Sequence, residues 1–318
     1  MRFNTLIIFT KRIFWHLAPG LFRRVVAKRT GQRFSIGIMS CDASLKLSAP
    51  AGLVNPVLTG ASVTDIPADF VADPFIFRTE THWCMYFEAF NLITRLGEIG
   101  LALSPDGIDW RYEKIVLSEP FHLAYPGVFT WNGGFYMIPD TPDNGVRLYR
   151  ADSPTDPWYF VRTLLEGKHF SDSTVFEYSG RWWMFSAWIS CPSNGASLKL
   201  YSASEPTGDW REHRLSPLIS NDRVAARPAG PVVEIDGRLI RFAQDGVPEY
   251  GSRVRAFEVS ELNEESYLER ELVQSPLLSG SGSGWNADGM HHVTLNKISE
   301  NSWLASVDGW YVIKHDER

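Results

Sequence analysis

The sequence lacks the residues and motifs that mark several common classes of enzyme and metal protein. Only three of its 318 residues are cysteines, Cys41, Cys84 and Cys191, and they lie far apart. An odd, widely spaced set favours neither a disulfide framework nor a CxxC metal site, and it is typical of a reducing compartment. No HExxH, GxGxxG, P-loop or GxSxG motif is present, which argues against zinc-protease, nucleotide-fold and serine-hydrolase mechanisms. We therefore expect no metal and no cofactor.

The interior of the chain also lacks a cluster of positive charge. The 31 Lys and Arg residues are outnumbered by 37 Asp and Glu residues, and the net charge is −6. Proteins that bind nucleic acid ordinarily present a dense basic patch. No nucleic-acid partner is therefore expected. Hydrophobic residues make up 44% of the chain, which is enough for a globular core.

The first 41 residues are the exception to this charge pattern, because they hold eight basic residues and no acid before Asp42. Six apolar residues there follow an approximate helical stripe: Phe3, Leu6, Ile7, Phe14, Leu17 and Leu21. The apolar run from Leu6 to Phe9 is too short for a secretory signal or a bilayer span. We predict that residues 1–33 form a short basic amphipathic helix on an anionic membrane surface. A disordered or docked leader is the alternative.

Aromatic residues and turn formers are abundant: 12 Trp, 11 Tyr, 19 Phe, 25 Gly and 19 Pro. They favour many short strands over long helices. Five segments share small or polar residues followed by an apolar strand: 72–77, 124–129, 171–176, 227–233 and 290–295. Each precedes a turn and a second strand, and the second strands end at Glu88, Asp140, Ala187, Asp245 and Asp308. The sequence therefore contains an internal repeat of five units.

Further strands complete the repeat unit. Four units show a third strand, over residues 99–104, 146–151, 198–204 and 254–259, and three show a fourth strand opened by Trp110, Trp158 or Trp210. Four strands per unit are typical of a propeller blade. The fifth unit lacks its third and fourth strands. Residues 34–38 have the pattern of a third strand and residues 44–47 could follow as the fourth, so the N-terminus can supply both. We predict an all-β, five-bladed β-propeller over residues 34–318, closed by its N-terminal strands.

The same period explains most of the tryptophans. Residues that recur once in each blade are expected to pack blade against blade. They are Trp110, Trp158, Trp182, Trp210 and Trp303. We therefore interpret them as core residues and not as a sugar-binding platform.

Polar residues at the starts of the first strands are expected to face one central funnel. These are Asp73, His122 with Tyr125, Asp172, Arg227, and His291 with His292; the second-strand ends add Glu88, Asp140, Gln244 with Asp245, and Asp308. One such Asp alone is more often a turn or cap residue. Charged groups avoid buried strands, so a ring of them in equivalent positions indicates a concave polar site. Neighbouring strand residues point to opposite faces, so at most one of the adjacent histidines should enter the funnel.

Several carboxylates with Arg, His and aromatic neighbours suit carbohydrate chemistry. A glycosidic bond is made or cleaved when one carboxylic acid moves the proton of the bridging oxygen. A second carboxylate then acts as base, nucleophile or stabiliser. Crowding of like charges would separate their pKa values and divide these roles. Arg227 is expected to hold a substrate carboxylate or phosphate.

These residues carry a resemblance to one family. The matching runs include Val71-Ala72-Asp73-Pro74-Phe75, Phe121-His122-Leu123-Ala124-Tyr125-Pro126, Ala226-Arg227-Pro228 and Val307-Asp308-Gly309. Residues 34–310 resemble the propeller domain at the N-terminus of plant glucosamine inositolphosphorylceramide transferases, which also occurs as shorter bacterial proteins. The plant proteins owe their name to a separate glycosyltransferase domain, so that name does not carry over.

The resemblance implies roles for individual acids. The domain is similar to the five-bladed propellers of furanosidases, fructosidases and mannoside phosphorylases, which place an Asp at the start of blades I and III. Asp73 and Asp172 match those positions, and Asp245 is the best substitute for a further acid in blade IV. Asp140 stands where this family usually has Glu.

The expected function is glycosyl transfer or remodelling in bacterial surface polysaccharide biosynthesis, on the cytoplasmic face of the membrane. The substrate would be a sugar or glycan that is nucleotide- or lipid-linked. The predicted catalytic residues are Asp73, Asp172 and Asp245. The predicted substrate-binding residues are Glu88, His122, Tyr125, Asp140, Arg227, Gln244, Tyr250, Trp285, His291, His292 and Asp308. The alternatives are a furanosidase-type glycoside hydrolase and a non-catalytic glycan-binding propeller that relies on Tyr125 and Trp285.

Overall fold

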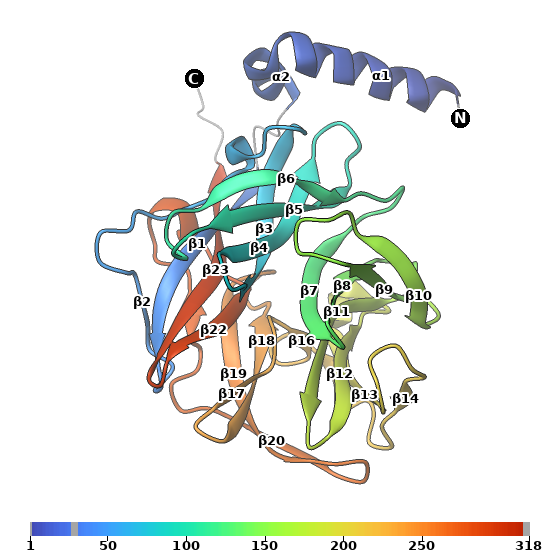
Figure 1. Ribbon diagram of the computed structural model, residues 1–318, viewed down its shortest axis with the longest axis vertical. Coiled ribbons are helices and arrows are strands. Elements are labelled where there is room, and N and C mark those ends of the chain that lie inside the picture. Colours follow the sequence, from blue (N-terminus) through green and yellow to red (C-terminus); the bar gives the residue numbers. More distant parts are fainter. Residues whose placement is uncertain (1, 27–30, 314–318) are drawn as a thin grey trace.

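Each repeat unit folds into one antiparallel sheet, and the five sheets surround a central axis (Figure 1). The computed structural model describes residues 2–26 and 31–313. In every blade the strand nearest the axis overlaps one of the five predicted polar segments. The five-bladed propeller predicted from the repeat is confirmed.

The first three blades follow the chain in order. Blade I holds β3 (Ala68–Arg78), β4 (Trp83–Asn91), β5 (Gly97–Ser104) and β6 (Arg111–Leu117). Blade II holds β7 (Ala124–Trp131), β8 (Gly134–Asp140), β9 (Val146–Ala151) and β10 (Tyr159–Leu165). Blade III holds β11 (Phe170–Tyr178), β12 (Arg181–Trp188), β13 (Ala196–Ala203), β14 (Arg211–Glu212) and β15 (Ile219–Asp222). Each fourth strand begins one residue after the predicted tryptophan.

The last two blades are less regular. Blade IV holds β16 (Arg227–Pro228), β17 (Val233–Ile235), β18 (Arg238–Asp245), β19 (Arg253–Leu262), β20 (Tyr267–Glu271) and β21 (Leu278–Ser279). Blade V holds β22 (Val293–Ser299), β23 (Ser302–Ile313), β1 (Gly31–Asp42) and β2 (Leu47–Ser48). Three 3₁₀ turns lie in the connections: η1 (Gly60–Ser62), η2 (Pro192–Asn194) and η3 (Gly284–Asn286).

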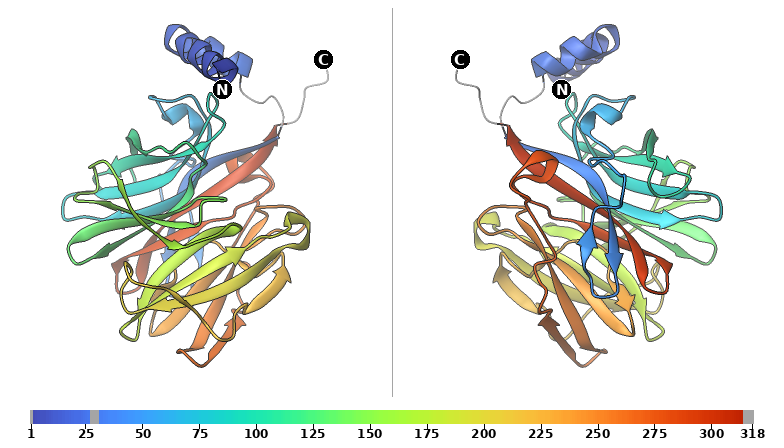
Figure 2. Two further views of the ribbon diagram at one scale, coloured as in Figure 1. Left: turned by 90° about the vertical axis from the view of Figure 1, so that its right-hand side faces the viewer. Right: turned by 90° about the vertical axis from the view of Figure 1, so that its left-hand side faces the viewer.

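The two ends of the propeller close the ring within blade V. Strand β1 pairs with β23 along its whole length, from Gly31 opposite Ile313 to Asp42 opposite Ser302. Figure 2 shows this blue strand beside the red one, and β2 completes the blade on the far side of β1. The predicted closure is therefore confirmed, and β1 begins three residues before the expected boundary at residue 34.

Apolar side chains fill the five seams between neighbouring blades. Each seam has its own buried cluster, and the recurring tryptophans lie in them. Trp158 packs between blades I and II, Trp182 and Trp210 between II and III, and Trp303 between IV and V. The turns satisfy two of the indole N–H groups, since Trp110 donates to Gly107 O at 2.8 Å and Trp210 to Pro206 O at 3.3 Å. The blade-to-blade interpretation is confirmed.

The N-terminal segment forms two helices, α1 (Arg2–Leu17) and α2 (Pro19–Val26). Proline at the first position of α2 begins a new helix because it has no N–H to donate. Trp15 and Phe22 pack on Leu92 and Ile93 in the β4–β5 loop. Figure 2 shows the two helices at the top of the molecule, outside the propeller. Among the described residues, no helix has both the length and the apolarity needed to cross a bilayer.

Part of the predicted stripe lies outside the description. The side chains of Phe3, Leu6, Arg23 and Arg24, and all of Lys28 and Arg29, are beyond the described residues. Of the others, Ile7, Leu17 and Leu21 are exposed and Phe14 is partly buried. Phe14 belongs to the cluster that packs on the propeller, whereas the three exposed members of the stripe take no part in it.

Candidate functional site

The first strands of blades I, II and III share an unusual backbone feature. Asp73, Tyr125 and Asp172 have φ values of 52°, 45° and 52°, in the left-handed region that most non-glycine residues avoid. At each of them the register with the second strand shifts, as in a β-bulge. A bulge turns a side chain away from the alternating strand pattern. These three residues are therefore directed toward the axis by the backbone itself.

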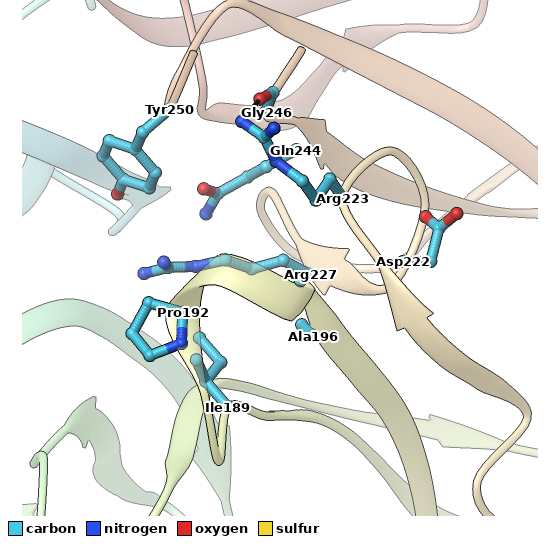
Figure 3. A pocket seen from close by; sticks show the side chains of 10 residues that line it. Ile189, Pro192, Ala196, Asp222, Arg223, Arg227, Gln244, Gly246 and Tyr250 are labelled. Carbon is cyan, nitrogen blue, oxygen red and sulfur yellow. Dashed lines mark hydrogen bonds between the residues drawn. The ribbon is translucent and has the colours of Figure 1, made fainter. Parts of the chain in front are cut away.

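The bulges border a pocket of about 350 Å³. Predicted site residues that line it are Asp73, Glu88, His122, Asp140, Asp172, Arg227 and Tyr250. A second pocket, shown in Figure 3, adjoins it at Ile189, Arg227 and Tyr250 and includes Gln244. Most of the polar residues that line the first pocket were thus among the predicted site residues. We call this first pocket the carboxylate pocket.

Asp172 is held by blade IV across the pocket. Its Oδ2 accepts hydrogen bonds from Arg227 Nε and, at 2.9 Å, from Gln244 Nε2. The Arg227 side chain is 26% exposed and that of Asp172 only 3%, so the guanidinium forms the solvent side of this pair. The Arg227 guanidinium also lies 5.0 Å from the centre of the Tyr250 ring. This geometry leaves Arg227 accessible to a ligand while it forms an ion pair with Asp172.

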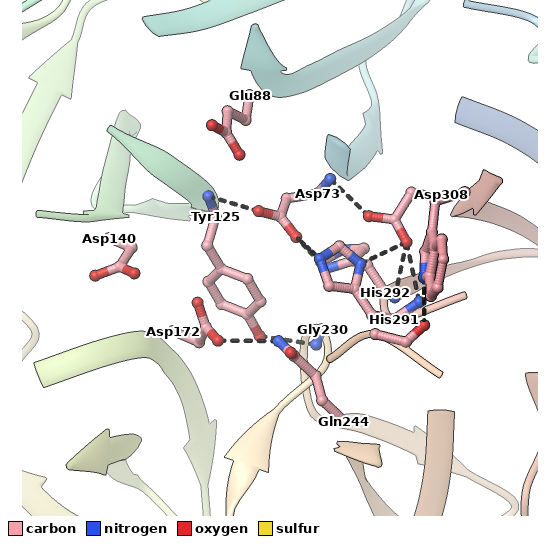
Figure 4. Close-up of polar contacts among 12 residues, drawn as sticks. Asp73, Glu88, Tyr125, Asp140, Asp172, Gly230, Gln244, His291, His292 and Asp308 are labelled. Atoms are coloured by element: carbon pink, nitrogen blue, oxygen red, sulfur yellow. Dashed lines mark hydrogen bonds and ion pairs between the residues drawn. The ribbon is translucent and has the colours of Figure 1, made fainter. Parts of the chain in front are cut away.

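Asp73 is held from the other side by blade V, as Figure 4 shows. His291 Nδ1 lies 2.7 Å from Asp308 Oδ1, and His291 Nε2 lies 3.7 Å from Asp73 Oδ1. Asp308 also accepts the backbone N–H groups of Asp73, His291 and His292 at 3.0–3.1 Å. Asp308 is fully buried and fixes the imidazole, which in turn faces Asp73. Asp308 and His291 therefore position Asp73 from behind.

Both adjacent histidines approach Asp73, although neither lines the carboxylate pocket. His292 Nδ1 lies 3.8 Å from Asp73 Oδ1, and its Nε2 contacts Thr294 Oγ1 at 3.1 Å. The expectation of opposite directions does not apply, because β22 begins only at Val293 and the two histidines precede the extended strand. Burial lowers the pKa of His292 to about 3, so this ring is neutral at physiological pH.

The carboxyl groups around the pocket have displaced pKa values. Burial, with the nearby Asp308 and Asp172 charges, raises the pKa of Asp73 to about 7, although His291 opposes the shift. Burial and Asp172 raise the pKa of Asp140 to about 7. Burial and the Asp73 charge place the pKa of Glu88 well above its ordinary value. Burial thus favours the protonated form of these three carboxyl groups, next to the ion-paired Asp172.

Blade V shows the opposite electrostatic effect. Burial alone would raise the pKa of Asp308, but the His291 imidazole more than offsets it and lowers the pKa. Burial disfavours the charged form of His291, yet Asp308 raises its pKa above the ordinary value. Asp308 and His291 are thus stabilised as a carboxylate–imidazolium pair.

Tyr125 forms the floor of the site and is fully buried. Its hydroxyl lies 2.7 Å from Thr174 Oγ1 and accepts the Gly230 N–H at 2.7 Å. Its ring meets Phe75 and His292 edge-on. The hydroxyl is occupied by these partners, so the structure gives Tyr125 a role in closing the channel below the carboxylates.

Two predicted site residues lie away from the pocket. Asp245 is fully buried and forms ion pairs with Arg253 at 3.2 Å and Arg255 at 2.9 Å. Trp285 packs over Gly37 and Gly309, where its ring fills the space of a missing side chain. The structure therefore does not bring Asp245 or Trp285 to the carboxylates.

Several residues that line the carboxylate pocket were not predicted from the sequence: Pro142, Asp143, His169, Phe170, Ser171 and Ile189. Ser171 donates to Asp140 Oδ2 at 2.8 Å, and its position directly before Asp172 was a usable signal. The others lie in or beside inter-strand loops, where the repeat has no pattern. Their contribution depends on how neighbouring blades meet.

One group in the described part of the chain has a spacing suited to a cation. Ligand atoms of Asp73, His291 and Asp308 lie within 4.8 Å of one another. Asp308 Oδ1, however, already accepts three hydrogen bonds, including the one from the His291 ring. The observed contacts are those of a proton-linked network.

Solved structures with this fold include carbohydrate-active enzymes. A thermostable family-43 glycoside hydrolase matches with a TM-score of 0.60 and 15% identity, covering 83% of this chain and 94% of that one. The catalytic domain of the GH62 α-L-arabinofuranosidase of Coprinopsis cinerea matches with a TM-score of 0.56 and 13% identity, over 75% and 90% of the two chains. At these identities the similarity establishes the fold.

Curated relatives match at higher identity. Glucosamine inositolphosphorylceramide transferase 1 of Arabidopsis thaliana is 34% identical over 273 residues, and its counterpart in Oryza sativa subsp. japonica is 32% identical over 265 residues. These alignments cover 83% and 81% of this chain, which spans about a third of the relatives' length (35% and 36%). Residues 34–310 match the family described as glucosamine inositolphosphorylceramide transferase 1, N-terminal. The chain belongs to this family.

Proposed function

We propose that the chain is an enzyme that makes or remodels a glycosidic bond in the carboxylate pocket. The observation that carries this proposal is the convergence of Asp73 and Asp172, from equivalent bulges of two blades, on one pocket. Their environments differ, since Asp172 is paired with Arg227 while the pKa of Asp73 is raised to about 7. Two carboxyl groups in different electrostatic environments can take the two different roles of glycosyl chemistry.

The geometry suggests a division of roles. Asp73, with a pKa near the working pH, moves the proton of the bridging oxygen. His291, oriented by Asp308, positions Asp73 and adjusts its charge. Asp172 stabilises the positive charge that develops at the anomeric carbon, and Arg227 anchors the substrate. Asp140 and Glu88 complete the polar wall as hydrogen-bond partners of sugar hydroxyls.

The wider role that fits is assembly or remodelling of a bacterial surface polysaccharide on the cytoplasmic face of the membrane, with a nucleotide- or lipid-linked sugar. The plant relatives are named for the lipid inositolphosphorylceramide, which makes a lipid-linked substrate one to test. Hydrolysis is the second candidate, favoured by the fold shared with the family-43 glycoside hydrolase.

One assay separates these functions. The full chain would be incubated with 4-nitrophenyl glycosides, which report hydrolysis, and with nucleotide-sugar donors plus a lipid extract, which report transfer. Asp73→Asn keeps the shape of the side chain and should reduce turnover by about 10²–10⁴-fold while sugar binding persists. A wild-type protein that binds sugars but turns over neither class would favour the non-catalytic glycan-binding propeller.

We also propose that the N-terminal helices bind an anionic membrane surface. Six large apolar side chains there are exposed: Ile7, Phe9, Ile13, Leu17, Leu21 and Val25. Arg12 is exposed among them, and the first 41 residues hold eight bases and no acid. The opposite face packs on Leu92 and Ile93, next to β4 and its pocket residue Glu88. A lipid surface would satisfy both the apolar and the basic groups.

Vesicle sedimentation tests this membrane proposal. Wild-type chain should bind vesicles that contain anionic lipid and should lose binding as salt rises, because charge attraction is screened. Leu17→Ser should weaken binding, whereas Val54→Ser, an equally exposed apolar residue of the propeller, should not. Equal sedimentation with neutral vesicles at low and high salt would contradict an anionic membrane partner.

A further inference from the structure

The second pocket lies between blades III and IV, beside the carboxylate pocket. It has a volume of about 320 Å³ and shares Ile189, Arg227 and Tyr250 with its neighbour. A ligand that fills the first pocket can therefore extend into the second past Arg227. The roles proposed above do not use this space.

The polar wall of this pocket holds two arginines, Arg223 and Arg227, of which Arg227 is ion-paired with Asp172. Arg227 donates to Asp172 through Nε alone. Its two terminal nitrogens take part in no hydrogen bond among the described residues. Arg223 donates from one terminal nitrogen to the carbonyls of Gly246 and Pro248, which holds its guanidinium at the rim. Two guanidinium groups with unused N–H donors are a suitable site for an oxyanion.

The one acid that lines this pocket does not face the two arginines. Asp222 Oδ1 accepts the backbone N–H groups of Val224 at 2.7 Å and Ala225 at 2.5 Å. Figure 3 shows the Asp222 carboxylate on the far side of the loop from Arg227, Gln244 and Tyr250. Its carboxylate therefore caps a turn and does not offset the charge of the two arginines.

A buried acceptor adds a second requirement. Gln244 Nε2 donates to Asp172 Oδ2 and to Pro228 O, both at 2.9 Å. Since both partners are acceptors, they fix the orientation of the amide. Gln244 Oε1 is buried and has no hydrogen-bond partner in the described part of the chain. An unpaired buried acceptor is unfavourable unless a ligand supplies a donor, such as a hydroxyl.

We propose that this second pocket binds a sugar residue that carries an oxyanion, either a carboxylate or a phosphate. The oxyanion contacts Arg223 and Arg227, a hydroxyl donates to Gln244, and the ring packs against Tyr250. This inference rests on the proposed function, because it places the acidic residue next to the sugar whose bond is made or broken. It identifies the substrate class as an acidic glycan.

Calorimetric titration of the full chain tests the proposal with D-glucuronate, D-glucose 6-phosphate and D-glucose. At least one of the two acids should bind about 10-fold more tightly than glucose, the value of one charge-assisted contact. The better of the two identifies the oxyanion. Arg223→Gln should remove most of this preference, because Arg223 lies in the second pocket alone. Arg211→Gln, a matched loss of charge on the exposed strand β14, should leave it unchanged.

Three results would overturn the proposal: equal affinity for all three probes, no binding of either acid at millimolar concentration, or equal losses in the Arg223 and Arg211 variants. The titration measures binding and needs no turnover. A negative result would therefore refute the subsite whether or not the chain is an enzyme. Conversely, an acid preference that depends on Arg223 would support the subsite even if Asp73→Asn left turnover intact.

Discussion

Blades I to III and blades IV and V contribute different side chains to the site. The first three supply the carboxyl groups that line the carboxylate pocket, Asp73, Glu88, Asp140, Asp143 and Asp172. The last two supply Arg227 and the two histidines behind Asp73. The difference begins in the backbone, since β3, β7 and β11 each carry a bulge with a left-handed residue. One blade architecture thus presents different side chains according to how its first strand starts.

Two buried aspartates make the contrast concrete. Asp172 of blade III contacts Arg227 and lines the pocket, whereas Asp245 of blade IV contacts Arg253 and Arg255 outside it. Both are nearly inaccessible, and both are ion-paired. Burial and pairing are therefore a poor guide to function, because structural ion pairs show them as well. The position relative to the pocket distinguishes the two.

The largest expected effect tests this pair of residues directly. Asp172→Asn should reduce turnover by about 10²–10⁴-fold, because it removes the charge that stabilises the reacting centre. Asp245→Asn, the matched control, should retain turnover per folded molecule and lose stability, since Arg253 and Arg255 would face a neutral group. Steady-state kinetics and thermal denaturation measure the two. Equal loss of turnover in folded Asp245→Asn would restore the catalytic role predicted for Asp245.

The second expected effect is on stability and its pH dependence. Because the pKa of Asp140 is raised to about 7 from an ordinary value near 3.8, the folded state binds more protons than the unfolded state between those pH values. The free energy of unfolding should therefore fall as pH rises through this window. Asp140→Asn should be more stable than wild type at pH 8 by about 1–3 kcal/mol, and the gain should vanish toward pH 4.

Calorimetric melting temperatures at several pH values measure this effect. Glu234→Gln removes an exposed acid of β17 and should leave the pH profile unchanged. A melting temperature of Asp140→Asn that stays below that of wild type at pH 8 would contradict the prediction. It would show that the ionised Asp140 carboxylate does not destabilise the folded state.

The smallest expected effect concerns Trp285 of η3, which packs over Gly37 and Gly309 instead of facing the pocket. Trp285→Phe should change sugar affinity by less than about two-fold, a shift below 0.5 kcal/mol. Tyr250→Ala, which removes a ring that lines both pockets, should weaken binding clearly more. The comparison would fail if the Trp285 variant lost the larger share of affinity in the titration.

Local patterns were enough to predict the blades. Alternating strands, turn residues and the recurring tryptophans act over a few residues, so a single sequence reveals them. Closure through β1 and β23 also followed, because the fifth unit lacked two strands and residues 34–38 had the missing pattern. In the N-terminal helices, by contrast, the local pattern did not predict which side chains pack on the propeller. The stripe through Leu17 and Leu21 is amphipathic, yet Trp15 and Phe22 pack on blade I because Leu92 and Ile93 lie there.

The sequence by itself determined the number of blades, their closure and the polar character of the funnel. The tertiary structure alone decided which polar residues meet. Asp73 and Asp172 reach the pocket because bulges turn them toward the axis, while Tyr125, at the same kind of bulge, is buried by Thr174 and Gly230 as a floor. Asp245 is turned toward β19 by Arg253 and Arg255. A repeat pattern specifies position along a strand, but side-chain direction and electrostatic neighbours come from other blades far away in sequence.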